Sequence, residues 1–187
     1  MRSAVVVPVK SFRLAKARLA PVLDDDARAA LARAMADRVV SAAGSIPVLV
    51  ACDDEEVAAW ARSRGAEVAW TPDTDLNGSV TEAVEILTNR GVTRVTVAHS
   101  DLPRARDLSL VVGTRGIVAV PDRRDDGTNV LTVPSHIGFP FSYGPGSFAR
   151  HRETANKMGV EFIVVRPPEL TWDVDDPEDL EGIDLCE

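Results

Sequence analysis

The stretch "VTEAVEILTNRGVTRVTVAHSD", residues 80–101, places a helical pattern directly before a strand pattern. Residues 80–91 are typical of a helix that ends at Gly91, since glycine commonly follows the last turn of a helix. Residues 92–100 form an apolar, β-branched run that predicts a buried strand leading into Asp101. Repeated along a chain, helices and buried strands in this order build a parallel sheet covered by helices.

The same alternation extends in both directions along the chain. Each predicted strand is a nearly continuous apolar run, as expected for strands that are buried on both faces. Together these segments predict a single α/β domain over residues 1–187, with helices layered on a mostly parallel sheet. The expected strands are 3–10, 46–52, 66–70, 92–100, 116–122, 129–134 and 160–165, and the expected helices are 27–42, 53–65, 80–91, 147–159 and 176–183.

The first of these helices has a predicted cap and a predicted buried stripe. Three aspartates at residues 24–26 precede it, where the helix dipole favours carboxylates. Apolar residues then recur at a spacing close to 3.6 and predict the face that turns inward. The expected stripe is Ala27, Ala30, Leu31, Ala34, Met35, Val39 and Ala42.

Composition excludes several classes of function. The net charge of −8 at pH 7 argues against a general nucleic-acid binder, which needs a basic face. No apolar run is long enough to cross a bilayer, and the N-terminal "AVVVPV" is too short for the core of a signal peptide. Cys52 and Cys186 have neither metal-ligand spacing nor a disulfide framework, so a cytoplasmic protein without nucleic-acid or membrane partners is expected.

Lysine is scarce in this chain, and its positions are informative. Of the 21 basic residues only three are lysines, and Lys10 and Lys16 lie close together in a basic loop, residues 8–19. In a chain that otherwise uses arginine, a retained lysine indicates a need for a compact ammonium, with chance placement as the alternative. Arg13 and Arg18 belong to the same loop, which leaves the first strand and can hold a polyphosphate. The loop lacks the glycines and the ending of a Walker A motif.

Two other segments of the chain carry carboxylates that are candidates for binding a cation. Asp101 directly follows a buried strand, at the carboxyl edge of the sheet where ligands of such folds bind. Asp173 and Asp175 lie two residues apart, so an extended chain points both toward one face. Two carboxylates on one face need a cation, and oxygen-only ligands suit Mg²⁺. The alternative is a purely structural role, since Asp176 and Pro177 are expected to cap and open the last helix.

Three further segments offer groups that bind ligands. Residues 127–129 provide backbone N–H groups, a hydroxyl and an amide just before a strand. Residues 144–147 open a helix, whose N-terminal N–H groups attract anions. Asn77, at the start of another helix, can meet a ribose or a base. Turns and caps use the same residue types, so each segment alone is weakly specific.

Taken together, the loops describe a site for a nucleoside triphosphate, Mg²⁺ and a second anionic substrate. No cysteine–histidine cluster, Ser-His-Asp order or activated nucleophile indicates a different chemistry. His99, His136 and His151 are isolated in the sequence, and none is assigned a catalytic role.

One ordered set of segments resembles a known family. The segments "VPVKSFRLAKARL", "LN", "SDLP", "GTNVL", "YGPGSFARH" and "DVDDPEDL" follow one another over nearly the whole chain. In this order they resemble the CofC and FbiD family of guanylyltransferases. The last three segments are the most specific, whereas the basic loop and "SDLP" are shared with wider nucleotidyltransferases. The resemblance implies a single three-layer Rossmann-like nucleotidyltransferase domain with a mostly parallel mixed sheet.

The resemblance also implies a reaction and a role for each candidate residue. The reaction joins GMP from GTP to the phosphate of phosphoenolpyruvate or 2-phospho-L-lactate, with release of pyrophosphate, in coenzyme F-420 biosynthesis. Mg²⁺ is the implied cofactor, and an acceptor phosphate that is already ionised needs no general base. The implied catalytic residues are Lys10, Lys16 and Asp101; the Mg²⁺ ligands are Asp101, Asp173 and Asp175; the phosphorylated acid is held by Thr128, Asn129, Gly144 and Ser147; and the nucleotide is bound by Lys10, Lys16, Arg18 and Asn77.

The sequence leaves several features undecided. An arginine- and alanine-rich composition suggests a bacterial chain, and bacterial members of the family are associated with phosphoenolpyruvate rather than 2-phospho-L-lactate. The alternatives are another phosphorylated acceptor, such as a sugar phosphate or molybdopterin, and a non-catalytic nucleotide-binding domain. The number of metal ions and the oligomeric state, with a homodimer as one option, are open. Arg104 and Asp126 depart from the family pattern, where apolar or smaller residues are usual.

Overall fold

The computed structural model describes residues 2–113, 115–181 and 183. Within them seven strands form one sheet in the order β3-β2-β1-β4-β6-β5-β7. The strands are β1 (Ser3–Pro8), β2 (Val48–Cys52), β3 (Glu67–Trp70), β4 (Arg94–Ala98), β5 (Ile117–Pro121), β6 (Thr128–Pro134) and β7 (Phe162–Val164). The helices are α1 (Asp25–Ala42), α2 (Glu55–Ser63), α3 (Leu76–Asn89), α4 (Ser109–Val112) and α5 (Ser147–Lys157), with short 3-10 helices η1 (Ala17–Leu19), η2 (Ser135–Ile137) and η3 (Pro177–Leu180).

Strand β6 runs against the other six strands of this sheet. β1 pairs in parallel with β2 and β4, β2 with β3, and β5 with β7, whereas β6 is antiparallel to β4 and β5. The mostly parallel mixed sheet expected from the sequence is therefore confirmed. Because β6 is reversed, its first residue, Thr128, lies at the same edge as the carboxyl ends of the other strands.

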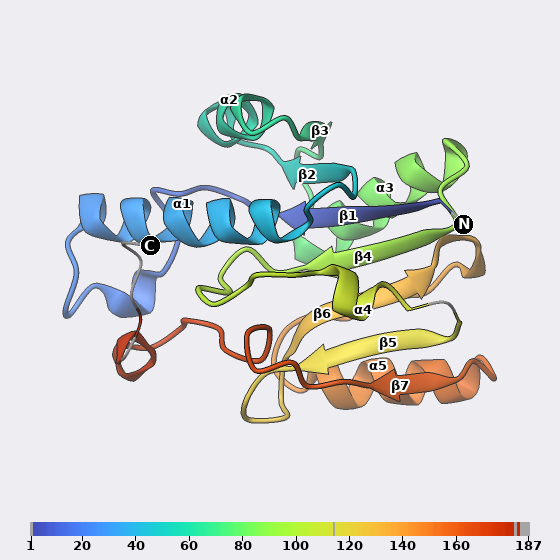
Figure 1. Cartoon of the computed structure of the whole chain (residues 1–187). Helices are drawn as coiled ribbons and strands as arrows, with labels where there is room; N and C mark the ends of the chain where they lie inside the picture. Colours follow the sequence, from blue (N-terminus) through green and yellow to red (C-terminus); the bar gives the residue numbers. More distant parts are fainter. Residues whose placement is uncertain (1, 114, 182, 184–187) are drawn as a thin grey trace.

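Helices cover both faces of the sheet and give three layers (Figure 1). On one face, α1, α2 and α4 bury residues such as Val39, Trp60 and Val111 against Val5 and Val50 of the sheet. On the other face, α3 covers the β1–β4 side and α5 covers the β5–β6 side. Full burial of one aliphatic side chain contributes about 1.5–3 kcal/mol, so these clusters fix the strands whose ends carry the candidate site.

The sequence predicts the caps of α1 and α2 better than it predicts the start of α3, which begins at Leu76 and not at residue 80, or the buried face of α1. Asp24 and Asp54 accept hydrogen bonds from first-turn N–H groups of α1 and α2, as expected for N-caps. The predicted stripe of α1 is partly wrong, because Ala30 is exposed whereas Ala32 and Ala36 are buried. Alanine is tolerated on either side of a helix, so its spacing does not fix the inward face. The short elements α4 and η1 are absent from the sequence prediction, since three or four residues carry no periodic signal.

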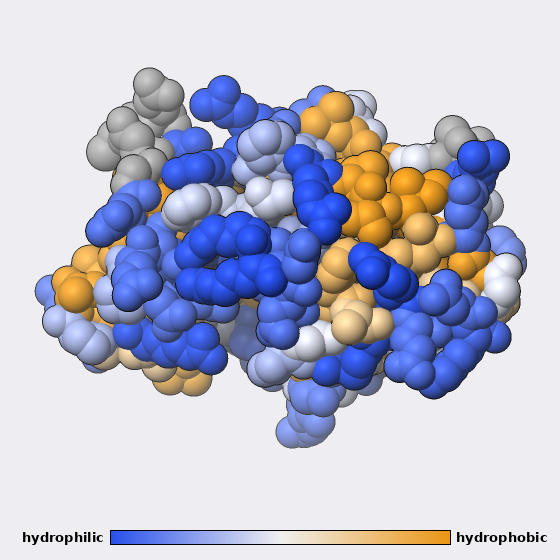
Figure 2. Space-filling view, turned by 90° about the horizontal axis from the view of Figure 1, so that it is seen from below, coloured by the Kyte–Doolittle hydropathy of each residue, from blue (hydrophilic) through white to orange (hydrophobic). Residues whose placement is uncertain are grey.

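The surface is mostly hydrophilic, but hydrophobic residues gather toward one end of the face seen in Figure 2. In the described part of the chain, no helix combines the length and the apolar character needed to cross a membrane.

The half-buried strand β7 forms one open edge of the sheet. A homodimer, one of the oligomeric states considered from the sequence, stays a prediction.

Candidate active site

Lys16 lies between two carboxylates at the carboxyl edge of the sheet. Its backbone is left-handed (φ 56°) at the N-cap of η1. Its Nζ atom donates to Asp101 Oδ2 at 2.7 Å and to Asp175 Oδ1 at 3.2 Å, across 85 and 159 residues of chain. Burial alone would lower the pKa of Lys16, but the two carboxylates raise it above its ordinary value. The ammonium therefore stays charged and joins three distant segments.

Asp101 and Asp173 each leave a carboxylate oxygen buried without a partner. The backbone carbonyl of Asp101 accepts a hydrogen bond from Val174 N at 3.2 Å, which holds the two acidic segments together. Among the described residues, Asp101 Oδ1 and Asp173 Oδ1 have no hydrogen-bond partner. Burial, with the negative charges of Asp101 and Asp175, raises the pKa of Asp173 to about 6. The region thus holds more negative charge than Lys16 neutralises.

The same carboxylates have the chemistry of a Mg²⁺ site. In the described part of the chain, no three acidic, histidine or cysteine side chains already converge as a metal-binding cluster. Instead, the Lys16 ammonium takes the place between Asp101 and Asp175. The unpartnered oxygens of Asp101 and Asp173 are of the type that Mg²⁺ prefers, and a cation would offset the cost of burying them. The donor set fits Mg²⁺, and the ligand set Asp101, Asp173 and Asp175 stays a prediction.

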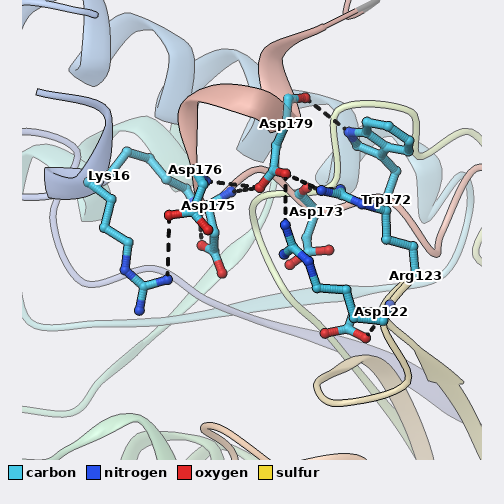
Figure 3. A network of polar contacts seen from close by, with 10 residues as sticks. Lys16, Asp122, Arg123, Trp172, Asp173, Asp175, Asp176 and Asp179 are labelled. Carbon is cyan, nitrogen blue, oxygen red and sulfur yellow. Dashed lines mark hydrogen bonds and ion pairs between the residues drawn. The ribbon is translucent and has the colours of Figure 1, made fainter. Parts of the chain in front are cut away.

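Asp179 holds the acidic segment, residues 171–180, in place. Its buried carboxylate accepts hydrogen bonds from the backbone N–H groups of Asp175 at 2.8 Å and Asp176 at 2.9 Å. Arg123 forms an ion pair with its other oxygen (Figure 3), and Arg124 pairs with the same oxygen. Burial alone would raise the pKa of Asp179, but these donors lower it. The expected cap of the last helix is confirmed, because Asp176 is the N-cap of η3.

Trp172 fixes the other end of the same segment. Its ring lies between two guanidinium groups, with Arg104 4.1 Å and Arg123 4.3 Å from the ring centroid. Its Nε1 atom donates to the carbonyl of Asp179 at 3.1 Å. Cation–π contacts of this kind contribute about 0.5–1 kcal/mol each at exposed sites. Arg104, which departs from the family pattern, therefore supports the acidic segment.

A pocket of about 530 Å³ extends from Lys16 to Lys10. Its lining includes most of the basic loop, Asp53 after β2 and Asp101 after β4. Lys10 Nζ donates to Asp53 Oδ2 at 2.8 Å and to the Thr74 carbonyl at 2.6 Å. The two lysines of the basic loop therefore face different parts of the pocket, Lys10 beside β2 and Lys16 beside β4. A contact between Lys10 and the triphosphate stays a prediction. The ammonium of Lys10 is held by Asp53 and the Thr74 carbonyl, which favours a role in the part of the pocket beside β2.

A buried network of hydroxyls and one imidazole lies where β6 and α5 begin. Thr128 Oγ1 lies 3.0 Å from His151 Nδ1 and accepts from Ser147 Oγ at 3.3 Å. His151 Nε2 accepts from the backbone N–H of Ser142 at 3.1 Å, so the ring proton lies on Nδ1 and faces Thr128. Burial lowers the pKa of His151 to about 4, which keeps the ring neutral. Thr128 and Ser147 meet as the sequence predicts, whereas His151 carries no signal beyond its place in "SFARH".

The N-terminus of α5 is largely satisfied by the chain itself. Ser147 N donates to the Gly144 carbonyl and Phe148 N to the Asp126 carbonyl, both at 3.0 Å. Gly146 N donates to Asp126 Oδ2, also at 3.0 Å. Asp126, the second departure from the family pattern, therefore supplies a carboxylate where the sequence suggests a free anion site. A substrate would meet the hydroxyls near this helix start, or would have to displace Asp126.

Asn77 and Asn129 both have partners within the fold. Asn77 Oδ1 accepts from Tyr143 N at 2.6 Å and ties α3 to the loop before α5. Asn129 is buried, and its Nδ2 atom donates to the Leu170 carbonyl at 3.1 Å. Gly144 is exposed in that loop. The role of Asn77 at the nucleoside, and those of Asn129 and Gly144 at the acid, stay predictions.

Comparison with known proteins assigns the chain to a family. The family model described as "Guanylyl transferase CofC like" matches residues 3–186. The chain belongs to this family. A phosphoenolpyruvate guanylyltransferase of Chloroflexus aurantiacus is 33% identical over 97% of this chain and 94% of its own length. One of Rubrobacter xylanophilus is 37% identical, over 94% and 90%. The resemblance drawn from the six sequence segments is confirmed.

Solved structures confirm the fold. A nucleotidyl transferase from Methanothermobacter matches with a TM-score of 0.67 at 16% identity, over 96% of this chain and 94% of that chain. CMP:2-keto-3-deoxy-manno-octonic acid synthetase complexed with CTP gives a TM-score of 0.64 at 15% identity, over 97% and 96%. At this identity the likeness concerns the fold alone, which is the Rossmann-like nucleotidyltransferase architecture expected from the sequence.

Proposed function

We propose that the chain transfers the guanylyl group of GTP to the phosphate of phosphoenolpyruvate, with release of pyrophosphate. The observation that carries this proposal is the match, over nearly the whole chain, to curated relatives named phosphoenolpyruvate guanylyltransferase. The clustering of acidic groups and Lys16 at the carboxyl edge of the sheet supports it, since nucleotides bind there in such folds. By the family resemblance, the reaction is a step of coenzyme F-420 biosynthesis, and the cysteine content favours a reducing cytoplasm as its setting.

The proposed reaction joins two phosphate groups. A phosphate oxygen of phosphoenolpyruvate attacks the α-phosphorus of GTP, and the bond to the bridging oxygen of the β-phosphate breaks. That oxygen leaves with the electron pair as part of pyrophosphate. The attacking phosphate is largely ionised at neutral pH, since the second pKa of such a group is about 6. No side chain has to remove a proton, which agrees with a site where burial lowers the pKa of both His99 and His151.

The main task of the chain is to bring two anionic substrates together. Lys16 would neutralise part of the triphosphate charge from its place at the carboxyl edge of β4. Arg18 is largely exposed, 3.9 Å from Asp176, and can reach the outer phosphates. The hydroxyl of Thr128 would donate to the phosphorylated acid, and Ser147 would support it by donating to Thr128 Oγ1. These groups hold and orient the reactants, which is the largest contribution a protein makes to phosphoryl transfer.

We assign Mg²⁺ to the carboxylates of Asp101, Asp173 and Asp175. When bound, the ion supplies Lewis-acid neutralisation of charge on the phosphate oxygens. The unpartnered oxygens and the raised pKa of Asp173 support this assignment, because they mark excess negative charge in a buried place. The site holds a fixed cation as well, since Lys16 is tied to the same carboxylates.

Pyrophosphate release tests the proposed reaction. The purified protein would be supplied with GTP, Mg²⁺ and either phosphoenolpyruvate, 2-phospho-L-lactate or no acceptor. We expect release that depends on phosphoenolpyruvate. Release with 2-phospho-L-lactate alone would replace the acceptor, and release with neither would overturn the proposal and require a screen of sugar phosphates and molybdopterin. GTP labelled with heavy oxygen at the bridge between the α- and β-phosphates should leave the label in pyrophosphate.

A further inference from the structure

Lys10 and Asp53 place a hydrogen-bond donor and an acceptor side by side in the pocket, away from the acidic cluster. Their Nζ and Oδ2 atoms are 2.8 Å apart, and the two side chains are 41% and 30% exposed. Lys10 also donates to the Thr74 carbonyl, so its ammonium lies where the ends of β1 and β2 meet the loop after β3. Both side chains line the pocket and are open to a ligand.

The start of α2 does not require Asp53. The neighbouring Asp54 is the N-cap of that helix, and its carboxylate accepts from Glu56 N at 2.8 Å and from Val57 N at 3.1 Å. A carboxylate that is next to a cap but points at a lysine in a pocket is available for recognition. The reaction proposed above leaves this pair without a role.

The pair lies at a suitable distance from the reacting groups. Strands β2 and β4 flank β1 on either side. Neighbouring strands are about 4.8 Å apart, so the ends of β2 and β4 are separated by roughly 10 Å. A nucleotide spans a comparable distance between the Watson–Crick edge of its base and its α-phosphate. A nucleotide whose α-phosphate lies near Asp101 and Lys16 would therefore bring its base to Asp53 and Lys10.

We propose that Asp53 and Lys10 recognise the Watson–Crick edge of guanine. The carboxylate accepts from the N1–H and N2–H groups, and the ammonium donates to O6. This inference rests on the proposed function, whose nucleotide is GTP. Guanine presents one acceptor beside two donors, which complements a donor beside a carboxylate. Adenine presents an amino group and an unprotonated N1 in the reverse order, so it would place donor against donor and acceptor against acceptor.

Equilibrium binding of GTP, ITP and XTP, measured with Mg²⁺ and without the phosphorylated acid, tests the inference. ITP lacks the N2 amino group, and XTP carries a carbonyl in its place. Hydrogen bonds to charged groups are strong enough that the wild-type protein should prefer GTP to ITP by about 10-fold or more, with XTP weakest. Asp53→Asn exchanges an acceptor for a donor, so GTP affinity should fall about 10- to 100-fold while XTP affinity rises. Misfolding cannot produce that gain.

Glu56→Gln is a matched control for the loss of one negative charge. Glu56 pairs with Arg13 and Arg33 in the first turn of α2 and is not part of the pocket lining. This variant should keep the wild-type order of affinities. An Asp53→Asn protein with the wild-type ratios, or a wild-type protein that binds none of the three, would overturn the inference. Selective GTP binding without pyrophosphate release would instead overturn the proposed reaction and leave the base assignment standing.

Discussion

Lys16 illustrates why a chain rich in arginine keeps a lysine at one position. Its side chain is 12% exposed and contacts Asp101 and Asp175 together. An ammonium is a compact point charge, whereas a guanidinium is planar and needs a fork of acceptors. The compact ammonium inferred from the scarcity of lysine is thus found in a confined place between two carboxylates.

Lys16→Arg should lower kcat/KM on the order of 100-fold even though the charge is kept. A displacement of about 1 Å in a positioning group is enough for a loss of this size. Steady-state pyrophosphate release measures the effect. Lys157→Arg is the matched control, because Lys157 is exposed and pairs with Glu153 one helical turn away. Full activity of Lys16→Arg would mean that positive charge alone suffices.

Asp175→Asn should abolish Mg²⁺-dependent turnover and leave the fold intact. The side chain of Asp175 is 43% exposed, so the substitution leaves no fully buried group without a partner. Turnover and thermal unfolding would be measured on the same preparation. Asp125→Asn removes an exposed carboxylate that pairs with Arg166, and it should change neither quantity. Retained turnover in Asp175→Asn would show that this carboxylate does not hold the cation.

His151 should make the stability of the folded protein depend on pH. Burial lowers its pKa to about 4 from the ordinary value near 6.5, so between these values the unfolded chain binds a proton that the folded chain does not. Stability is complete above about pH 6.5 and falls as the pH drops toward 4, by at most on the order of 3 kcal/mol. Urea unfolding near pH 7 and near pH 5 should show a smaller difference for His151→Asn than for wild type. Equal differences would contradict the prediction.

Single residues of the candidate site are easier to predict from the sequence than the residues they contact. Asp101 is predictable because it ends an apolar strand, and Asp173 because it alternates with Asp175. The contact between Lys16 and Asp175 spans 159 residues, and no local pattern encodes it. The link from His151 to Thr128 likewise exists only once α5 packs on the sheet, so sequence reasoning missed it.

Among the elements, the acidic segment 171–180 is shaped by contacts more than by regular structure. Only its end forms a helix, the short η3. The rest is fixed by Trp172, which lies between two guanidinium groups, and by the buried carboxylate of Asp179. These contacts place Asp173 and Asp175 beside Asp101, so the stability of this segment and the function of the site are coupled.

Asp179→Asn should destabilise the protein by about 3 kcal/mol, because it leaves the paired guanidinium groups without their buried anion. Activity should fall as well, because asparagine keeps only one acceptor oxygen, and the backbone N–H groups of Asp175 and Asp176 then compete for it with the two guanidinium groups. Urea unfolding and pyrophosphate release would measure the two effects. Glu178→Gln, one residue earlier and exposed, should stay within about 0.5 kcal/mol of wild type. A loss of stability without a loss of activity would contradict the coupling between the stability of the acidic segment and the function of the site.

The strands and helix caps of this protein are predictable from sequence. The buried face of a helix and the direction of a strand are less predictable. Apolar runs mark the strands, and Asp24 and Asp54 mark the helix starts, because these signals are local. The inward face of α1 is obscured by its many alanines. The direction of β6 is not encoded in its apolar run, which has the same pattern in both directions. Only pairing with β4 and β5 decides it, and that reversal brings Thr128 to the site.

On the scale of the whole molecule, an acidic protein is proposed to bind two anionic substrates. The net charge is −8, and the pocket is lined by carboxylates as well as by Lys10 and Lys16. Overall charge therefore opposes the approach of GTP, and local cations have to offset it. Two lysines against Asp53, Asp101 and their neighbours leave little positive charge to spare, so a bound metal ion should decide whether GTP binds.

GTP should accordingly raise the melting temperature only when Mg²⁺ is present. A ligand that binds the folded state alone, at 100 times its Kd, stabilises that state by about 2.7 kcal/mol. For a chain of this size the corresponding shift is roughly 5–10 °C. Thermal unfolding with GTP and Mg²⁺, and then with GTP and EDTA, measures it. An equal shift in EDTA would mean that the lysines suffice and that Mg²⁺ is not needed for binding. The same measurement on Asp175→Asn identifies what holds the ion. This variant should melt like wild type without ligand and should lose the shift caused by GTP and Mg²⁺. Neither a weakened fold nor a lost lysine could explain both results, so they would show that the carboxylates hold the ion.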